Sequence, residues 1–138
     1  MYLGNYLFLL FYFINLILDL RSSRTVECIK NHKSVLFILI LHHLFDTFCF
    51  FGWLLSPLLF LKLYLVIISV LLLYWFYNRY CHVTRLVNNI CGWNRYDLFN
   101  DIFLKLGMKD KGVGPVKYYY IFMFMGILIA LFRVFLYK

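Results

Sequence analysis

The chain has 138 residues, of which 64% are hydrophobic and only 14% are charged. Its mean hydropathy is +0.81. Soluble domains are about half apolar and about a quarter charged, so this composition excludes a disordered chain, a coiled coil and an ordinary cytosolic enzyme. Most of the surface must lie in lipid, and the sequence predicts an integral membrane protein.

Four apolar stretches are each long enough to cross a bilayer, because a helix of about 20 residues spans the hydrocarbon core. They cover residues 2–20, 34–55, 57–78 and 118–136. Backbone groups in lipid have no water to bond, so these stretches are predicted to be helices. We therefore expect an all-α protein with a single membrane domain, residues 1–138, built as a four-helix bundle.

Positive charge is concentrated between the first and second spans and between the third and fourth. Eleven of the 14 Lys and Arg residues lie in residues 21–33 or 79–117. The positive-inside rule places both segments in the cytosol and both termini on the non-cytosolic side. The net charge of +8 then reflects topology and headgroup binding, and nucleic-acid binding is not expected.

Residues 79–117 form a predicted basic segment on the cytosolic side. The third span is expected to continue as a helix to about residue 92, and an interfacial amphipathic helix is expected at residues 96–106. Candidate contacts to anionic headgroups or a docking partner are Arg79, Arg85, Arg95, Lys105, Lys109, Lys111 and Lys117.

Ionisable residues within the predicted spans are candidates for buried polar contacts, because they are costly in lipid and usually face protein or a cavity. They are Asp19, His42, His43, Asp46 and Arg133. As helix–helix glue, Asp46 is expected to pair with Arg133 or with His42. The alternative is a proton relay or a metal or haem site built on His42, His43 and Asp46.

Small residues are scarce, with one Ala and seven Gly against 16 Phe and 12 Tyr. Close helix packing needs small side chains, so it is expected at Gly52, Ser56, Gly126 and Ala130. The same bias favours an A/T-rich gene, as in a large DNA virus, a protist or an organelle.

The four cysteines are predicted to be free or buried thiols. Three of them lie on the predicted cytosolic side, where disulfides are rare. Weak zinc candidates match no established spacing, so no metal and no cofactor are expected. They are Cys28, His32, Cys81, His82 and Cys91. No nucleophile elbow, phosphate loop or zinc-protease motif is present, and we expect a non-enzymatic protein.

One pattern extends from the second span into the basic segment. It consists of His42 or His43, Gly52, Trp75 and the run Cys81-x-x-Thr84-x-x-x-Asn88. It resembles an uncharacterised family of small multi-pass membrane proteins with a Cys-Pro-Leu-Thr-x-x-Glu-Asn segment, although His82 and Val87 replace the Pro and the Glu. The composition also resembles small membrane proteins of nucleocytoplasmic large DNA viruses, many of which lie in the internal membrane of the virion.

These features favour a structural component or anchor in a large assembly. We expect a virion inner-membrane protein whose partners are the bilayer, anionic headgroups and other subunits such as the capsid. One alternative is an accessory subunit of an organellar membrane complex. The other is a small oligomeric transporter or redox protein that uses His42, His43 and Asp46.

Overall fold

The computed structural model of the chain describes residues 3–78, 81–93 and 116–136, with side chains from Tyr120 onward in the last range. Within these ranges the protein is entirely helical, as predicted, and contains no strand. The elements are α1 (Leu3–Leu20), α2 (Ser23–Asn31), α3 (Ser34–Phe51), the 3-10 helix η1 (Gly52–Leu54), α4 (Leu58–Asn78), α5 (His82–Cys91) and α7 (Val116–Leu136).

Three helical segments are long and apolar enough to cross a membrane, namely α1, α3 together with η1, and α4. They coincide with the first three predicted spans. In α7 the stretch Tyr120–Leu136 is apolar but shorter, so the fourth span stays a prediction. Only 11% of the apolar stretch in α1 and 17% of that in α4 is buried, against 39% for α3. Helix α3 is therefore the central helix, and α1 and α4 present apolar faces suited to lipid.

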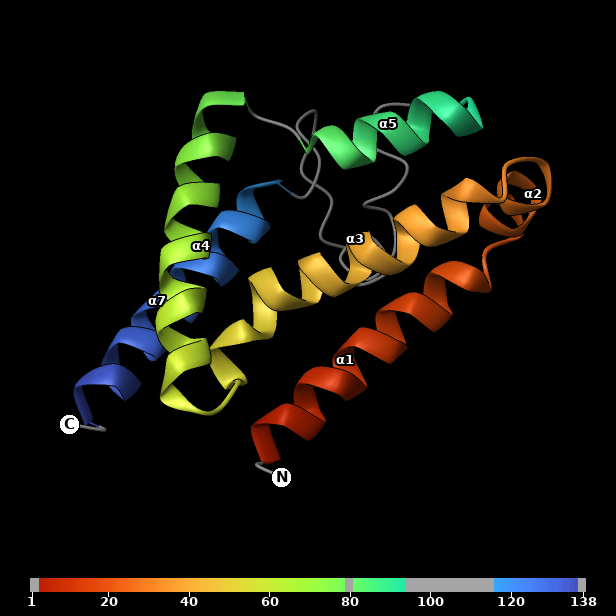
Figure 1. Cartoon of the computed structure of the whole chain (residues 1–138). Coiled ribbons are helices and arrows are strands. Elements are labelled where there is room, and N and C mark those ends of the chain that lie inside the picture. Colours follow the sequence, from red (N-terminus) through yellow and green to blue (C-terminus); the bar gives the residue numbers. More distant parts are fainter. Residues whose placement is uncertain (1–2, 79–80, 94–115, 137–138) are drawn as a thin grey trace.

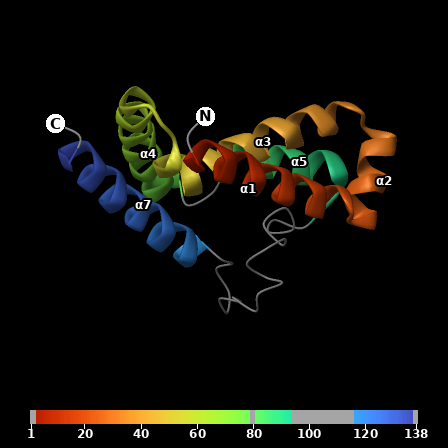
Figure 2. The same cartoon turned by 90° about the horizontal axis from the view of Figure 1, so that it is seen from below.

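The long helices form two pairs rather than one parallel bundle (Figure 1). Helix α1 lies beside α3, and α7 lies against α4. Helices α3 and α4 diverge from the hairpin at residues 55–57, where η1 contacts both α1 and α7. Figure 2 shows the two pairs on either side of this junction. The helical class is confirmed, whereas a four-helix bundle is not.

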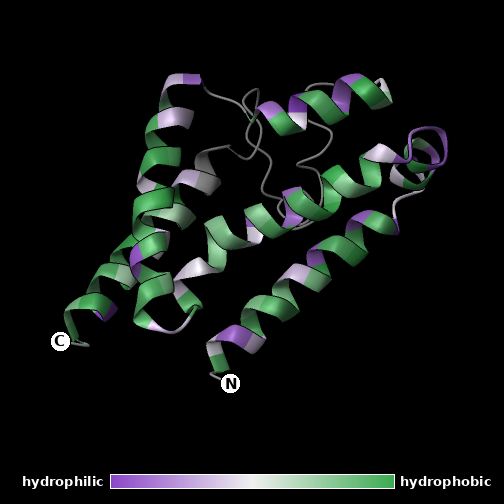
Figure 3. Cartoon of the chain, in the orientation of Figure 1, coloured by the Kyte–Doolittle hydropathy of each residue, from purple (hydrophilic) through white to green (hydrophobic). Residues whose placement is uncertain are grey.

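Two separate clusters of buried side chains hold the pairs together. The junction cluster joins α3, α4 and α7 through Cys49, Leu61, Tyr64, Ile68, Met123 and Ala130. The outer cluster joins α2, the first turns of α3, and α5 through Cys28, Val35, Leu39 and Val87. Helix α3 thus runs past the end of α1 to pack on two short helices. Figure 3 shows hydrophilic residues gathered at this same end, on α2, the turn after it, and α5.

The third predicted span does not continue as one helix to residue 92. Helix α4 ends at Asn78, and α5 begins at His82 in a different direction (Figure 1). Cys81, directly before α5, has an extended backbone with φ −88° and ψ 123°. The change of direction allows Thr84 and Val87 to be buried against α3. Burial of this face redirects the chain here, although the sequence has no helix-breaking residue at this point.

Helix α5 ends where the sequence places a glycine. Gly92 has φ 65°, the left-handed conformation in which glycine commonly terminates a helix. The predicted interfacial helix at residues 96–106 lies outside the described residues.

The ring of Tyr64 fills the junction between two of the predicted close-packing positions. Its hydroxyl donates to the Cys49 carbonyl at 3.2 Å, and its side chain is fully buried. A Cβ atom on Gly126 would lie 2.5 Å from Tyr64 Oη, and one on Gly52 would overlap the ring. Ala130 is also fully buried in this cluster. The helices meet closely here because these positions carry almost no side chain.

We expect Gly126→Ala to destabilise the fold by about 1–3 kcal/mol, because overpacking forces a buried side chain to move. The added methyl group would also lie 2.9 Å from Trp53 Cδ1. The free energy of unfolding in mixed micelles measures the effect. In a Tyr64→Phe background the penalty should be smaller, because the nearest atom is gone. An equal penalty in both backgrounds would show that the packing is different.

Candidate functional site

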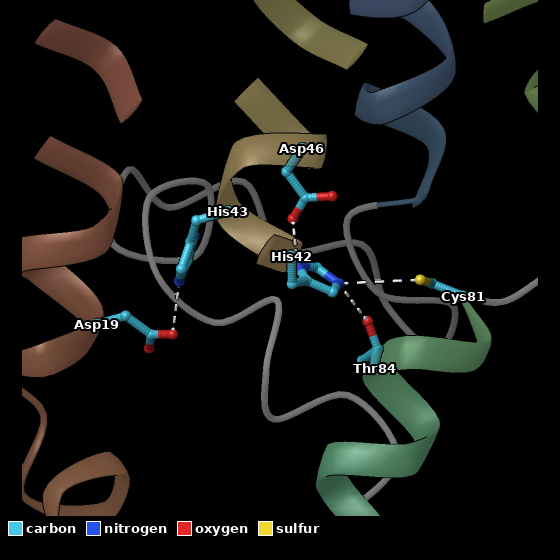
Figure 4. Close-up of polar contacts among 6 residues, drawn as sticks. All are labelled: Asp19, His42, His43, Asp46, Cys81 and Thr84. Carbon is cyan, nitrogen blue, oxygen red and sulfur yellow. Dashed lines mark hydrogen bonds and ion pairs between the residues drawn. The ribbon is translucent and has the colours of Figure 1, made fainter. Parts of the chain in front are cut away.

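A cluster of buried polar side chains lies where the last turn of α1 and the first turn of α5 meet the middle of α3 (Figure 4). His42 and His43 are both buried on α3, and Asp46 follows His42 by one helical turn. The imidazole rings of the two histidines lie 6.2 Å apart, edge to face. Each histidine points to a different neighbour, so the cluster consists of two polar groups side by side.

The first polar group joins α1 to α3. His43 Nε2 lies 2.8 Å from Asp19 Oδ2, and the two side chains are only 9% and 6% exposed. Thr25 of α2 donates from its hydroxyl to the other carboxylate oxygen of Asp19, at 3.5 Å. Asp19 therefore has partners on two other helices, and this pair fixes where α1 ends against α3.

The second polar group joins α3 to α5. His42 Nδ1 lies 2.8 Å from Asp46 Oδ2, one turn along the same helix. On its other side, His42 Nε2 lies 3.1 Å from Thr84 Oγ1 and 3.8 Å from Cys81 Sγ. The Asp46 carboxylate lies on the Nδ1 side of the ring, and Nε2 faces the hydroxyl and the thiol of the neighbouring helix.

The His42 imidazole changes the acidity of the Cys81 thiol. Burial opposes ionisation of this thiol, but the hydrogen bond from His42 and its positive charge outweigh burial, with help from Thr84, so the pKa of Cys81 is lowered. Thiolates are stabilised in this way beside a protonated histidine and at the start of a helix. Cys81 occupies the position directly before α5.

Arg133 does not pair with Asp46, which is a correction to the first of the two predicted partners. Its guanidinium donates to the Trp53 carbonyl and, at 3.2 Å, to the Ser56 hydroxyl. Asp46 and Trp53 are seven residues apart, about 10 Å along a helix, so Arg133 lies too far along α3. Asp46 has instead the other predicted partner, His42.

Asn5 makes a polar contact that was not predicted from the sequence. Its side-chain amide accepts from the Ser56 backbone N–H at 3.1 Å and donates to the Ser56 carbonyl at 3.4 Å. The signal was present, because an Asn within an apolar run needs a partner. Through Asn5 and Arg133 the first turn of α1 and the last turn of α7 both bind the hairpin, so these two helix ends lie at one end of the molecule.

Two of the predicted free cysteines form a disulfide, which is a second correction. Cys28 of α2 and Cys91 of α5 are bonded, with Cα atoms 5.5 Å apart and a sequence separation of 63. Two of the weak zinc candidates are therefore bonded to each other and do not provide thiolate ligands for a metal. Within the described residues no group of three metal-ligating side chains is found. Cys49 and Cys81 are not disulfide-bonded.

A cleft of about 280 Å³ lies beside the disulfide and is lined mainly by polar side chains of α2 and by Trp93. The Arg24 guanidinium lies 5.4 Å from the centre of the Trp93 ring, a cation–π contact. Of the predicted headgroup or docking residues, Arg85 is exposed on α5 and Lys117 lies in α7. The remaining five, Arg79, Arg95, Lys105, Lys109 and Lys111, lie outside the described residues.

Comparison with known protein families, characterised proteins and solved structures finds none that matches this chain. The fold therefore defines a class, a helical protein with three helices long and apolar enough to cross a membrane. Function has to be argued from the polar contacts themselves.

Proposed function

We propose that the protein is a multi-pass membrane protein that acts as a structural component or anchor of a larger assembly. The observation that carries this proposal is the use of the polar side chains in the spans. Asp19 with His43, Asn5 with Ser56, and Arg133 with Trp53 each join two elements of the fold. Polar groups within membrane helices serve in this way to hold helices in register.

The proposed topology has four spans, with α7 as the fourth. Its support is the position of the helix ends, because α1 begins and α7 ends at the hairpin. That end carries few charges, whereas the basic residues of segment 21–33 lie on and beside α2 at the opposite end, so we place both termini on the non-cytosolic side. The proposed docking surface is the basic segment, residues 79–117.

More specifically, we propose that the protein lies in the internal membrane of a virion, in contact with the capsid. Its support is compositional, namely the shortage of Ala and the abundance of Phe and Tyr. An accessory subunit of an organellar membrane complex has the same support.

Purification of the full-length protein from its native membrane in mild detergent tests the structural role. We expect a defined complex, larger than the monomer, by native mass spectrometry. Deletion of residues 96–111 should release the partner while the protein stays in the membrane. A monomer in the native membrane would contradict the role as an anchor. A partner that stays bound after the deletion would contradict the proposed docking surface.

The orientation of the protein in the membrane gives a separate prediction. The charge distribution places the basic end in the cytosol, whereas a disulfide at the same end favours an oxidising compartment. Lys30 is exposed on α2 at the basic end. We expect Lys30→Cys to react with a membrane-impermeant maleimide only from the cytosolic side, and a tag added after residue 138 to be accessible only from the other side. The reverse pattern would place the basic end and its disulfide in an oxidising compartment.

Two neighbouring histidine–aspartate pairs, in one of which the Asp46 carboxylate is only half-buried, also favour a second candidate, a small oligomeric proton-conducting protein. Their rings lie 6.2 Å apart in the interior of the helical pairs. Proton flux into liposomes that contain the purified protein tests this candidate. Loss of flux in His43→Gln with the fold intact would support it, and the absence of flux in the unmodified protein would exclude it.

A further inference from the structure

At the junction between α4 and α5, a thiol, an imidazole and a carboxylate lie in a row in space. Cys81 Sγ lies 3.8 Å from His42 Nε2, and His42 Nδ1 lies 2.8 Å from Asp46 Oδ2 (Figure 4). In this order a carboxylate orients an imidazole, and the imidazole takes the proton of a thiol, which is how cysteine nucleophiles are activated.

We propose that Cys81, His42 and Asp46 form a reactive thiolate site, and that Cys81 forms a mixed disulfide with a disulfide-bearing molecule at this end of the protein. The inference goes beyond the structural role and does not rest on it. Thr84 is a positioning residue, because its hydroxyl lies 3.1 Å from His42 Nε2 and holds the ring toward α5.

Two features of the surroundings favour an ionised thiol, and a third makes it accessible. Cys81 directly precedes a ten-residue helix, whose first N–H groups and dipole stabilise a negative charge. The hydrogen bond and positive charge of His42 add to this and lower the pKa of the thiol. Cys81 is half-buried and next to the exposed His82, so an external molecule can reach it.

The choice of a disulfide as the reacting group follows from the chemistry of the same end of the molecule. The Cys28–Cys91 bond shows that disulfides exist there. In the reaction the Cys81 thiolate attacks one sulfur of the external disulfide and forms a new S–S bond. The old S–S bond breaks, and the departing thiolate takes the proton that His42 holds on Nε2. Cys81 is oxidised and the departing thiol is reduced, so no other reagent is required.

The mixed disulfide should persist, because no second thiol is placed to displace it. Cys91 lies ten residues further along α5, about 15 Å away, and is already bonded to Cys28. Cys49 is fully buried in the junction cluster, seven residues beyond His42 along α3, a rise of about 10 Å. The site is therefore suited to a lasting covalent link rather than to repeated turnover.

The titratable and charged groups around Cys81 in the described residues come from three helices. They are His42, Asp46 and Cys49 on α3, Tyr74 on α4, and His82 and Arg85 on α5. The sulfur atom makes hydrogen bonds with the His42 imidazole and with Thr84. His82 is the natural control, since it is the neighbouring imidazole and its ring lies against Tyr74 of α4, with ring centres 5.8 Å apart.

The test uses the full-length protein in detergent micelles, with oxidised glutathione as the disulfide probe and intact mass as the readout. We expect one glutathione per chain, on Cys81, and none in Cys81→Ser. His42→Gln should slow the reaction about 10-fold near pH 6.5 and change it little near pH 9, where any thiol is ionised. Asp46→Asn should have a smaller effect in the same direction. His82→Gln should leave the pH profile unchanged.

Two results would overturn the proposal. One is an unmodified Cys81 in the folded protein. The other is a pH profile of the unmodified protein that coincides with that of His42→Gln. Because His42→Gln could fail to fold, thiolate absorbance of the unmodified protein, with Cys81→Ser subtracted, gives a measurement without that variant. Its midpoint should lie below the ordinary thiol pKa of about 8.5, and a midpoint at or above that value contradicts the proposal.

Discussion

Replacing His43 by Leu should destabilise the protein far more than replacing its partner Asp19 by Leu. The first change leaves a buried carboxylate without its imidazole, and breaking a buried pair in this way costs about 3–5 kcal/mol. The second removes the carboxylate itself and loses one interhelical hydrogen bond, worth about 1 kcal/mol in membrane proteins. Unfolding of each variant by a denaturing detergent in mixed micelles measures the difference.

The double replacement of Asp19 and His43 by Leu completes this comparison. It removes both polar groups, so much of the loss seen in His43→Leu should be recovered. Asn15→Leu is a matched control on α1, one turn before Asp19, since its side chain makes no hydrogen bond within the described residues and its loss should have little effect. Equal losses in the two single variants would mean that the carboxylate is not held as an anion by His43.

Properties that depend on local sequence were predictable. The predicted spans 34–55 and 57–78 each differ by one residue from Ser34–Leu54 and Leu58–Asn78, because hydropathy is a property of each stretch alone. The contact between His42 and Asp46 was also accessible, because side chains four residues apart lie on one helical face. The choice between His42 and Arg133 as the partner of Asp46 could not be predicted from the sequence, since it depends on where α7 crosses α3.

Properties that depend on a change of chain direction were missed. The break after Asn78 has no Pro or Gly to mark it, and the chain turns there because Thr84 and Val87 are buried against α3. Without that turn, Cys81 would extend the span and lie far from His42. Cys81 therefore has the pattern of an ordinary thiol in the sequence, and the site that contains it depends on the fold.

The prediction of free cysteines was wrong for Cys28 and Cys91, for a related reason. Four cysteines allow several pairings, and spacing alone does not select one. The assumption of a reducing cytosol then favoured free thiols. The bond between Cys28 and Cys91 follows only from the packing of α2 and α5 on the first turns of α3.

That bond leads to the second large effect. Replacing Cys28 and Cys91 together by Ala should destabilise the outer cluster by about 2–4 kcal/mol, because the bond closes a loop of 63 residues and restricts the chain when the cluster opens. The loss should be local. The three apolar helices keep their place in the membrane without the bond, so amide hydrogen exchange should rise in α2 and α5 and change little in α4.

A reductant supplies the matched control for this variant. Dithiothreitol should reproduce the exchange pattern of the double variant in the unmodified protein and have no further effect on the variant itself. Thiol-blocked protein should also run faster on a non-reducing gel than after reduction, because the bond keeps the denatured chain compact. Identical mobility in the two lanes would show that Cys28 and Cys91 are not bonded. Exchange that rises equally in α4 would mean that the bond supports the whole fold rather than the outer cluster alone.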